Sequence, residues 1–158
     1  KFRRQRQMCI RDRIQDAKDN GYEFLLGGDV DPTGTGYYVP ISILDNPPED
    51  ARIVAEEQFG PVMPLMKFSS EAEVIERANN TEYGLAGAIW TEDPDKGVEI
   101  AEQLETGTVW VNEFLHLNPL ASFGGHKQSG FGVEYGIEGL KEFTYAQVIT
   151  VKHDAARA

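Results

Sequence analysis

The chain has 158 residues and a formal net charge of −11, a length that suits one domain with a sizeable core. Its composition, 41% hydrophobic and 26% charged, is ordinary for a globular protein, and no apolar run reaches the roughly 20 residues that cross a bilayer. The single cysteine, Cys9, excludes an internal disulfide framework, and the cytoplasm is the predicted location.

Charge is distributed unevenly along the chain. The first 13 residues hold six Lys or Arg and one Asp, a net charge of +5, and the remainder carries −16. An acidic body repels nucleic acid and anionic membranes, so neither is a predicted partner. The chain starts at Lys1, and Met8–Arg13 (MCIRDR) resembles translated sequencing-adapter read-through. We therefore expect residues 1–13 to be a basic tail that is foreign to the fold.

In chain order, the first expected element is a helix that ends before Gly21, a residue suited to a C-terminal cap. Two strands follow at residues 22–28 and 37–44, joined by a turn-rich loop, and Pro40 favours an edge position or a bulge for the second. A short helix is expected within residues 45–57. The apolar run that follows, up to Phe68, predicts a strand buried on both faces.

The middle of the chain alternates between helix and strand patterns. Ser70 and Glu73 form a capping box before a helix that ends near residue 80, and a buried strand is expected next, up to Thr91. Asp93 as N-cap and Pro94 at the first helical position predict a second helix. We expect Gly107 to close that helix and a third strand to follow. This alternation predicts a parallel α/β sheet.

The stretch Ser122–Gly136 (SFGGHKQSGFGVEYG) holds five glycines and has the look of a phosphate-binding loop. The phosphate loop needs lysine directly after its last glycine, and here His126 precedes Lys127. The dinucleotide pattern fails as well, because Tyr135 stands where its third glycine belongs. We expect the glycines to serve positive φ angles and close backbone approach instead, with Lys127 and Ser129 in structural hydrogen bonds.

Four stretches, taken together, identify a family. They are EEQFGPV at 56–62, NNTEYGLAGAIWT at 79–91, GTVWVN at 107–112 and SFGGHKQSGFGVEYGIEGL at 122–140. In order and spacing they resemble the C-terminal part of the NAD(P)-dependent aldehyde dehydrogenase superfamily. The resemblance implies an α/β fold in which residues 14–143 form the C-terminal half of the catalytic domain, with a parallel-type sheet, and residues 144–158 form an oligomerisation strand and tail.

The resemblance implies oxidation of an aldehyde to a carboxylic acid through a cysteine thioester, with NAD or NADP as cofactor. In the family, the nucleophile, the general base and the nucleotide fold lie upstream of the segment that this chain resembles. Cys9 lacks the surroundings of the family's nucleophile. No catalytic residue is therefore assigned within the chain, and we expect the chain alone to be inactive.

Two groups of binding residues carry over from the family pattern. In the motif E-x-F-G-P, the glutamate accepts hydrogen bonds from the nicotinamide ribose and the phenylalanine packs near the nicotinamide, which implies these roles for Glu57 and Phe59. Residues between WVN and FGG line the substrate tunnel, and an apolar tunnel suits an uncharged aldehyde. The predicted tunnel residues are Leu115, His116, Leu117 and Phe123.

The remaining expectations concern partners and alternatives. The closing strand QVITVK resembles the family's oligomerisation strand and implies a homo-oligomer, with a small-molecule aldehyde as the other partner. His126 and His153 have no cysteine or second histidine at ligand spacing, so no metal is assigned. Two alternatives stay open: a non-catalytic oligomerisation or interaction module, and a member that transfers the acyl group to coenzyme A.

Overall fold

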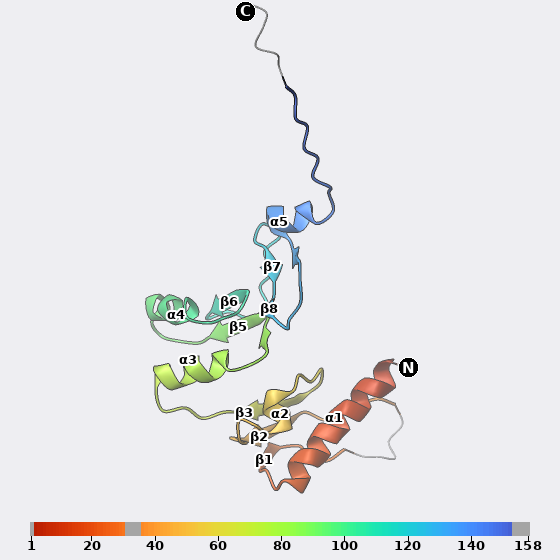
Figure 1. Ribbon diagram of the computed structural model, residues 1–158. Coiled ribbons are helices and arrows are strands. Elements are labelled where there is room, and N and C mark those ends of the chain that lie inside the picture. The colour runs from red at the N-terminus through yellow and green to blue at the C-terminus, as the bar shows by residue number, and fades with distance from the viewer. Residues whose placement is uncertain (1, 31–35, 153–158) are drawn as a thin grey trace, which may run out of the picture. The chain divides into compact units, whose positions relative to one another are not determined.

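The computed structural model describes residues 2–30 and 36–152 (Figure 1). For residues 2–4 and 6, in the first helix, only the backbone is described. Part of the expected loop at 29–36, His153 and the end of the tail lie outside this range. The chain divides into two compact units, Lys1–Ser70 and Glu71–Ala158. Among the described residues, no helix combines the length and the apolarity that a membrane span needs.

The first unit begins with α1, Phe2–Asp19, a helix that continues through the segment expected to be foreign. Its end is the predicted glycine cap: Gly21 has a φ of 72°, and the N–H groups of Gly21 and Tyr22 bond the carbonyls of Lys18 and Ala17 at 2.9 Å. Ile10, within the segment expected to be foreign to the fold, is 6% exposed and belongs to the core of this unit. The origin of the segment stays a prediction.

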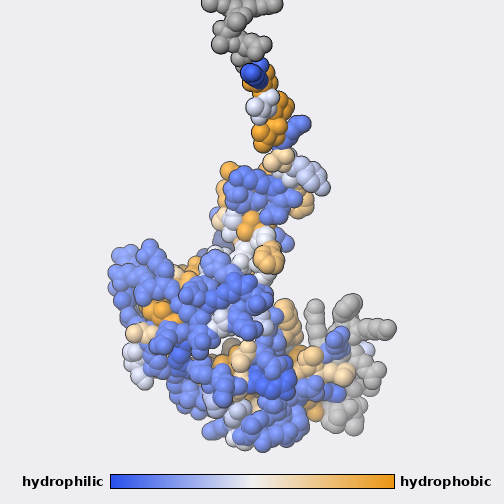
Figure 2. Space-filling model, in the orientation of Figure 1, coloured by the Kyte–Doolittle hydropathy of each residue, from blue (hydrophilic) through white to orange (hydrophobic). Residues whose placement is uncertain are grey.

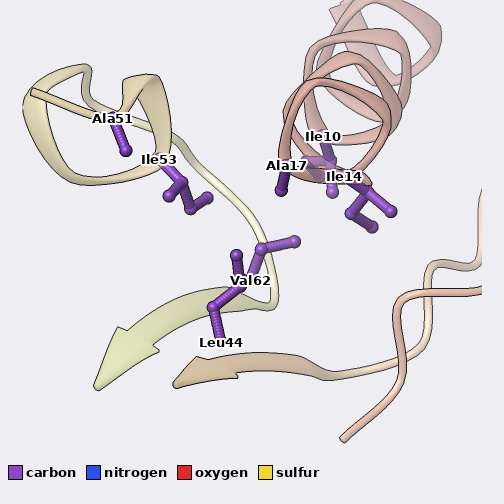
Figure 3. Close-up of a cluster of buried hydrophobic side chains, with 7 residues drawn as sticks. All are labelled: Ile10, Ile14, Ala17, Leu44, Ala51, Ile53 and Val62. Atoms are coloured by element: carbon purple, nitrogen blue, oxygen red, sulfur yellow. The ribbon is translucent and has the colours of Figure 1, made fainter. Parts of the chain in front are cut away.

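A three-stranded sheet lies beside α1, with β2 in its centre. The strand β2 pairs antiparallel with β1 and parallel with β3, and Leu44 of β2 is fully buried. Figure 3 shows the cluster that joins the sheet to the helices, formed by Ile10, Ile14, Ala17, Leu44, Ala51, Ile53 and Val62. The elements after α1 are β1 (Phe24–Leu26), β2 (Ser42–Asp45), α2 (Arg52–Ala55) and β3 (Val62–Leu65).

Two expectations for this sheet were wrong. The second strand starts after Pro40 and is central, so the proline, which cannot donate a ladder hydrogen bond, lies outside the pairing. The strand β3 is not buried on both faces: Val62 faces the core, whereas Met63 is 50% and Leu65 44% exposed. Within this unit β3 is an edge strand, and the helices cover only one face of it.

The second unit contains a second parallel pair, β5 and β6, connected through α4. The predicted N-cap of α4 is confirmed, since the Asp93 carboxylate accepts from the N–H groups of Asp95 and Lys96 at 3.1 and 3.2 Å. Gly107 does not close this helix, which ends at Ala101. The elements are α3 (Glu71–Asn79), β4 (Tyr83–Gly84), β5 (Ala86–Ile89), α4 (Pro94–Ala101) and β6 (Thr108–Val111).

Burial in this unit is lower than the sequence predicts. No residue of α3 is buried, and the strand expected to be buried is split at the exposed Leu85 into β4 and β5. Close packing occurs instead at Gly97 of α4, where an added Cβ would lie 2.6 Å from Cγ1 of Val111. The α/β class and the parallel pairing are confirmed, in small separate sheets.

The glycine-rich stretch forms two short antiparallel pairs. The strand β7 (Phe123–Gly124) pairs with β9 (Val133–Glu134), and β8 (His126–Lys127) pairs with β4. Helix α5 (Gly136–Lys141) follows directly. The stretch is therefore a folded ribbon that pairs once within itself, through β7 and β9, and once with β4, through β8.

The chain beyond α5 is extended and exposed. Residues 145–152 have no strand partner in the described structure. Figure 2 shows hydrophobic side chains along this tail; Val148 is 88%, Ile149 76% and Val151 64% exposed. The predicted oligomerisation strand is thus unpaired in the single chain.

Candidate functional site

The first group of predicted site residues lies in the turn between α2 and β3. Glu57 is exposed, and Phe59 is 69% exposed. Gln58, between them, is half-buried and its Nε2 donates to the carbonyl of Val62 at 2.7 Å. Gly60 allows the close approach of α1, because a Cβ there would overlap the Ile10 side chain. The turn is held from within at Gln58 and Gly60, and it presents the two predicted cofactor residues on the surface.

Glu56 and Glu57 are neighbours with different environments. The Glu56 carboxylate pairs with Arg52 at 2.8 Å and with Arg13. The Arg52 hydrogen bond, aided by the charge of Arg13, holds the pKa of Glu56 below its usual range. The Glu57 carboxylate makes no side-chain hydrogen bond or ion pair with the described residues, so its oxygens are available to a ligand's hydroxyl groups.

The second group lies in the loop after β6, and Trp110 organises it. Trp110 is 7% exposed, and its Nε1–H donates to the carbonyl of His116 at 2.9 Å. Its ring lies edge-on to Phe114, with centroids 5.9 Å apart, and stacked on Phe123 at 6.4 Å. One buried indole therefore contacts the beginning, the middle and the end of the loop.

The predicted tunnel residues lie around this indole with their side chains largely outward. Leu115 is 60% and Leu117 41% exposed, and Phe123 is half-buried in β7. The His116 ring is exposed and its Nδ1 lies 3.2 Å from Glu113. Leu115 has a φ of 56°, which is rare for a bulky side chain and costs roughly 1–3 kcal/mol. The loop thus presents an apolar surface on a strained backbone.

The start of this loop is fixed by Asn112. This residue follows β6 with a φ of 56°, and its side-chain amide exchanges two hydrogen bonds of 2.8 Å with the backbone of Thr91. In the first unit, Asn46 follows β2 in the same way, with a φ of 47° and its Oδ1 accepting from the N–H of Lys67 at 2.8 Å. Both asparagines extend a parallel strand pair by a side-chain rung.

The predicted structural role of the glycine-rich ribbon is confirmed. Gly130, Gly132 and Gly136 have φ angles of 116°, 79° and 62°. A Cβ at Gly124 would lie 2.5 Å from the Val133 side chain, and one at Gly125 would lie 2.6 Å from Ser129. These glycines therefore allow the positive φ angles and the close approaches of the ribbon.

The two polar side chains of the ribbon are in structural hydrogen bonds, as expected. Lys127 donates to the carbonyl of Asn79 and pairs with Glu105, both at 2.7 Å. The Ser129 hydroxyl accepts from the N–H of Gly84 at 2.9 Å. Lys127 and Ser129 thus tie the ribbon to β4 and to the end of α3.

An open cavity of about 420 Å³ lies against the ribbon. Its lining includes the exposed Phe131 and Phe143, together with Glu134, Glu142 and backbone of the glycines. None of the predicted tunnel residues except Phe123 contributes to it. The cavity is therefore separate from the surface formed by Leu115 and Leu117.

The cofactor residues lie in the first unit and the loop residues in the second. Cys9 is exposed on α1, and the described residues contain no cluster of three or more His, Cys, Asp or Glu that could hold a metal ion. Trp110 and Asn112 were not predicted as part of the site. Their signals were a large aromatic within an apolar strand and an asparagine directly after it.

The sequence pattern of the aldehyde dehydrogenase family matches residues 3–149. The chain is 44% identical over 144 residues to aldehyde dehydrogenase 1A1 of Gallus gallus, which covers 90% of this chain and 28% of that protein. It is also 44% identical to "Aldehyde dehydrogenase, cytosolic 2" of Macroscelides proboscideus, over 90% of this chain and 59% of that protein. The chain therefore spans less than two thirds of these relatives.

The fold is similar to that of a solved relative. The NAD+ complex of an aldehyde dehydrogenase from Bacillus cereus superposes with a TM-score of 0.84 and 40% identity, over 89% of this chain and 28% of that one. The family match begins at residue 3, inside the segment expected to be foreign.

Proposed function

Because the chain belongs to the aldehyde dehydrogenase family, we propose that it is part of an enzyme that oxidises an aldehyde to a carboxylic acid with NAD or NADP. The observation that carries the proposal is the pair of exposed groups in the turn after α2: the carboxylate of Glu57, which has no side-chain partner among the described residues, and the aromatic ring of Phe59. The NAD+ complex of the Bacillus cereus relative supports the choice of cofactor.

The chemistry of the turn fits one end of a nicotinamide nucleotide. An ionised carboxylate accepts only, so it matches the two neighbouring hydroxyl groups of a ribose. The Phe59 ring offers a flat apolar surface that would limit the motion of a nicotinamide ring. When bound, the nicotinamide ring would accept a hydride. Glu57 and Phe59 would hold and orient it.

The loop around Trp110 would supply the apolar wall for the aldehyde. Leu115, Leu117 and Phe123 are the proposed wall residues and His116 the residue at the mouth, because the first three offer apolar surface and all four lie in the loop after β6 or in the strand that ends it. Burial of apolar substrate surface contributes roughly 25 cal/mol per Å², which binds aldehydes without strong selection among them.

We propose that the nucleophile and general base lie outside these 158 residues and that the chain alone has no turnover. The family's reaction needs a cysteine thiolate, and the only cysteine is exposed on α1. Residues 14–143 would then belong to the catalytic domain and residues 144–158 to an oligomerisation strand and tail. The proposed setting is a cytoplasmic homo-oligomer, in keeping with the name of the cytosolic relative.

The test compares the complete protein that carries this sequence with the 158-residue chain. We expect aldehyde-dependent NADH or NADPH formation from the complete protein and none from the chain. Turnover by the chain would overturn the assignment of the nucleophile. An inactive complete protein would favour the second candidate, a non-catalytic interaction module, which the exposed tail also fits. Formation of an acyl-coenzyme A would identify the acylating alternative.

A substitution tests the cofactor residue itself. In the complete protein, Glu57→Gln should raise the KM for the nicotinamide cofactor about tenfold, because a charge-assisted hydrogen bond contributes about 1.5–3 kcal/mol. Glu102→Gln, at an exposed position after α4, is the matched control and should leave the KM unchanged. Equal KM values for the two variants would contradict the proposed role.

A further inference from the structure

The loop between β6 and β7 combines exposure with a fixed backbone. Phe114 is 65%, Leu115 60% and Leu117 41% exposed, so side-chain burial does not hold the middle of the loop. Exposed loops without regular structure are ordinarily mobile. Here Leu115 adopts a left-handed φ of 56°, a conformation that persists only where neighbouring contacts enforce it. The contacts that hold Leu115 in this conformation therefore also fix the path of the loop backbone.

Trp110 provides the contact next to the strained residue. Its Nε1–H donates to the carbonyl of His116, the residue directly after Leu115, at 2.9 Å. The indole nitrogen is a donor only, and Trp110 is 7% exposed, so loss of this acceptor would leave a buried donor unpaired. The backbone of the loop is thus tied to the strand at its midpoint.

The far side of the loop is tied to the glycine-rich ribbon. The N–H of Gly136, at the start of α5, donates to the carbonyl of Pro119 at 3.0 Å. Phe123 of β7 stacks on the Trp110 ring with an interplanar angle of 28°. Backbone carbonyls accept the hydrogen bonds from Trp110 and Gly136, and the Phe123 ring makes the stacking contact. These contacts leave the side chains of Leu115, His116 and Leu117 exposed.

We infer that Trp110 is a positioning residue for the aldehyde: it holds the loop backbone at His116 so that the exposed side chains of Leu115 and Leu117 form a preset apolar wall. The inference rests on the proposed function. Since the anchor acceptor is a main-chain oxygen, the side chain at 116 can change without loss of the anchor. A preset wall lowers the conformational cost of binding, which changes affinity rather than the chemical step.

The test replaces the donor and preserves the ring. In the complete protein, Trp110→Phe retains an aromatic side chain but has no N–H. A closer isostere is 3-benzothienylalanine at position 110 in a Trp90→Phe background, which keeps the indole shape and lacks the donor. Trp90→Phe alone is the matched control, because Trp90 is 70% exposed.

Two readouts are measured on each variant. Amide hydrogen exchange should become at least threefold faster in residues 113–121 and stay unchanged in β5 and β6. The KM for an apolar aldehyde should rise about fivefold with kcat within twofold, the effect expected from one lost hydrogen bond of about 1 kcal/mol. His116→Ala should leave loop exchange unchanged, because it keeps the carbonyl.

Each possible result of these measurements either supports or overturns a stated part of the inference. Unchanged loop exchange, or equal acceleration in the loop and in β5 and β6, would overturn the anchor and assign Trp110 to the core alone. Faster loop exchange with an unchanged KM would overturn the role toward the aldehyde. If the unsubstituted complete protein shows no aldehyde-dependent turnover, the proposed function fails first, whereas an active parent with an unaffected Trp110→Phe variant contradicts this inference only.

Discussion

At the scale of single residues, two asparagine side chains extend the hydrogen bonding of parallel strand pairs by one position beyond the strands. Asn46 and Asn112 each follow the last residue of a parallel strand in the left-handed region. Asparagine tolerates this region better than most residues, and its amide carries the same donor and acceptor as a peptide group. Asn112 uses both the donor and the acceptor of its amide, whereas the bond from Lys67 uses only the acceptor of Asn46.

Substitutions at Asn112 separate these two properties. Asn112→Gly keeps the backbone free but removes both bonds to Thr91, and it should lower the free energy of unfolding by about 1–2 kcal/mol. Asn112→Ala also forces a Cβ into the left-handed region and should cost about 1 kcal/mol more. Urea unfolding monitored by circular dichroism measures the difference. Equal midpoints for the alanine and glycine variants would contradict the strain contribution.

Glu56 gives the first unit an acid-sensitive contact. Its hydrogen bond with Arg52 lowers its folded-state pKa below the ordinary 4.5. A group whose folded pKa is depressed stabilises the fold above its unfolded pKa and loses that contribution as pH falls through the folded value. As the pH is lowered from 5 into the acid range, the free energy of unfolding should therefore fall more for the wild type than for Glu56→Gln. Urea titrations at matched salt measure this difference. Parallel curves for the two proteins would exclude this contribution.

At the scale of elements, the second unit depends on close backbone approach. Gly107, at the entry to β6, lies where an added Cβ would overlap the carbonyl oxygen of Gly124 in β7. A flexible side chain can move aside, but backbone held in two paired strands cannot move without a loss of pairing. This contact joins the parallel pair to the glycine-rich ribbon.

Two glycine-to-alanine substitutions test this contact. Gly107→Ala should destabilise the protein by about 2–3 kcal/mol or prevent the ribbon from docking. Gly87→Ala, in the neighbouring β5, is the matched control, because its Cβ would meet only Cδ1 of Leu104 at 3.7 Å, an ordinary contact. Thermal unfolding of both variants compares them directly. A Gly107→Ala protein as stable as Gly87→Ala would show that the approach is not required.

Local signals predicted elements well, whereas burial was predicted poorly. The Asp93 cap and the Gly21 cap depend on residues within a few positions of one another, and both are present. The burial of β3 depends on which elements cover it, and only its Val62 face is covered in its own unit. The role of Trp110 depends on Phe114, His116 and Phe123 returning to the same ring, which a linear pattern does not encode.

At the scale of the whole molecule, the family could be identified from four motifs, but the arrangement of its parts could not. Glu57 and Phe59 belong to one compact unit and the Trp110 loop to the other. Motif spacing gives order along the chain and carries no information on distance between units. The cofactor and tunnel assignments therefore stay predictions that the kinetic variants test.

The exposed tail predicts assembly through residues 145–152. An unpaired apolar strand can add to the sheet edge of a neighbouring subunit. In sedimentation velocity of the complete protein, Ile149→Lys should shift the population toward single chains. Thr150→Lys is the control, because it adds the same charge without loss of an apolar side chain, and it should shift the population less. An Ile149→Lys protein that assembles like wild type would assign oligomerisation to another surface.

The two asparagine rungs also differ in how they should age. In deamidation, the next residue's backbone nitrogen attacks the side-chain carbonyl and ammonia leaves; water then opens the resulting succinimide to aspartate or isoaspartate. Asn46 is followed by Pro47, which has no N–H, and this route is closed to it. Asn112 is followed by Glu113, and its conversion to aspartate would place a carboxylate against the Thr91 carbonyl that its amide now donates to at 2.8 Å. Deamidation should therefore weaken the side-chain rung that extends the β5–β6 pair at the start of the Trp110 loop, and leave the Asn46 rung beside the β2–β3 pair intact.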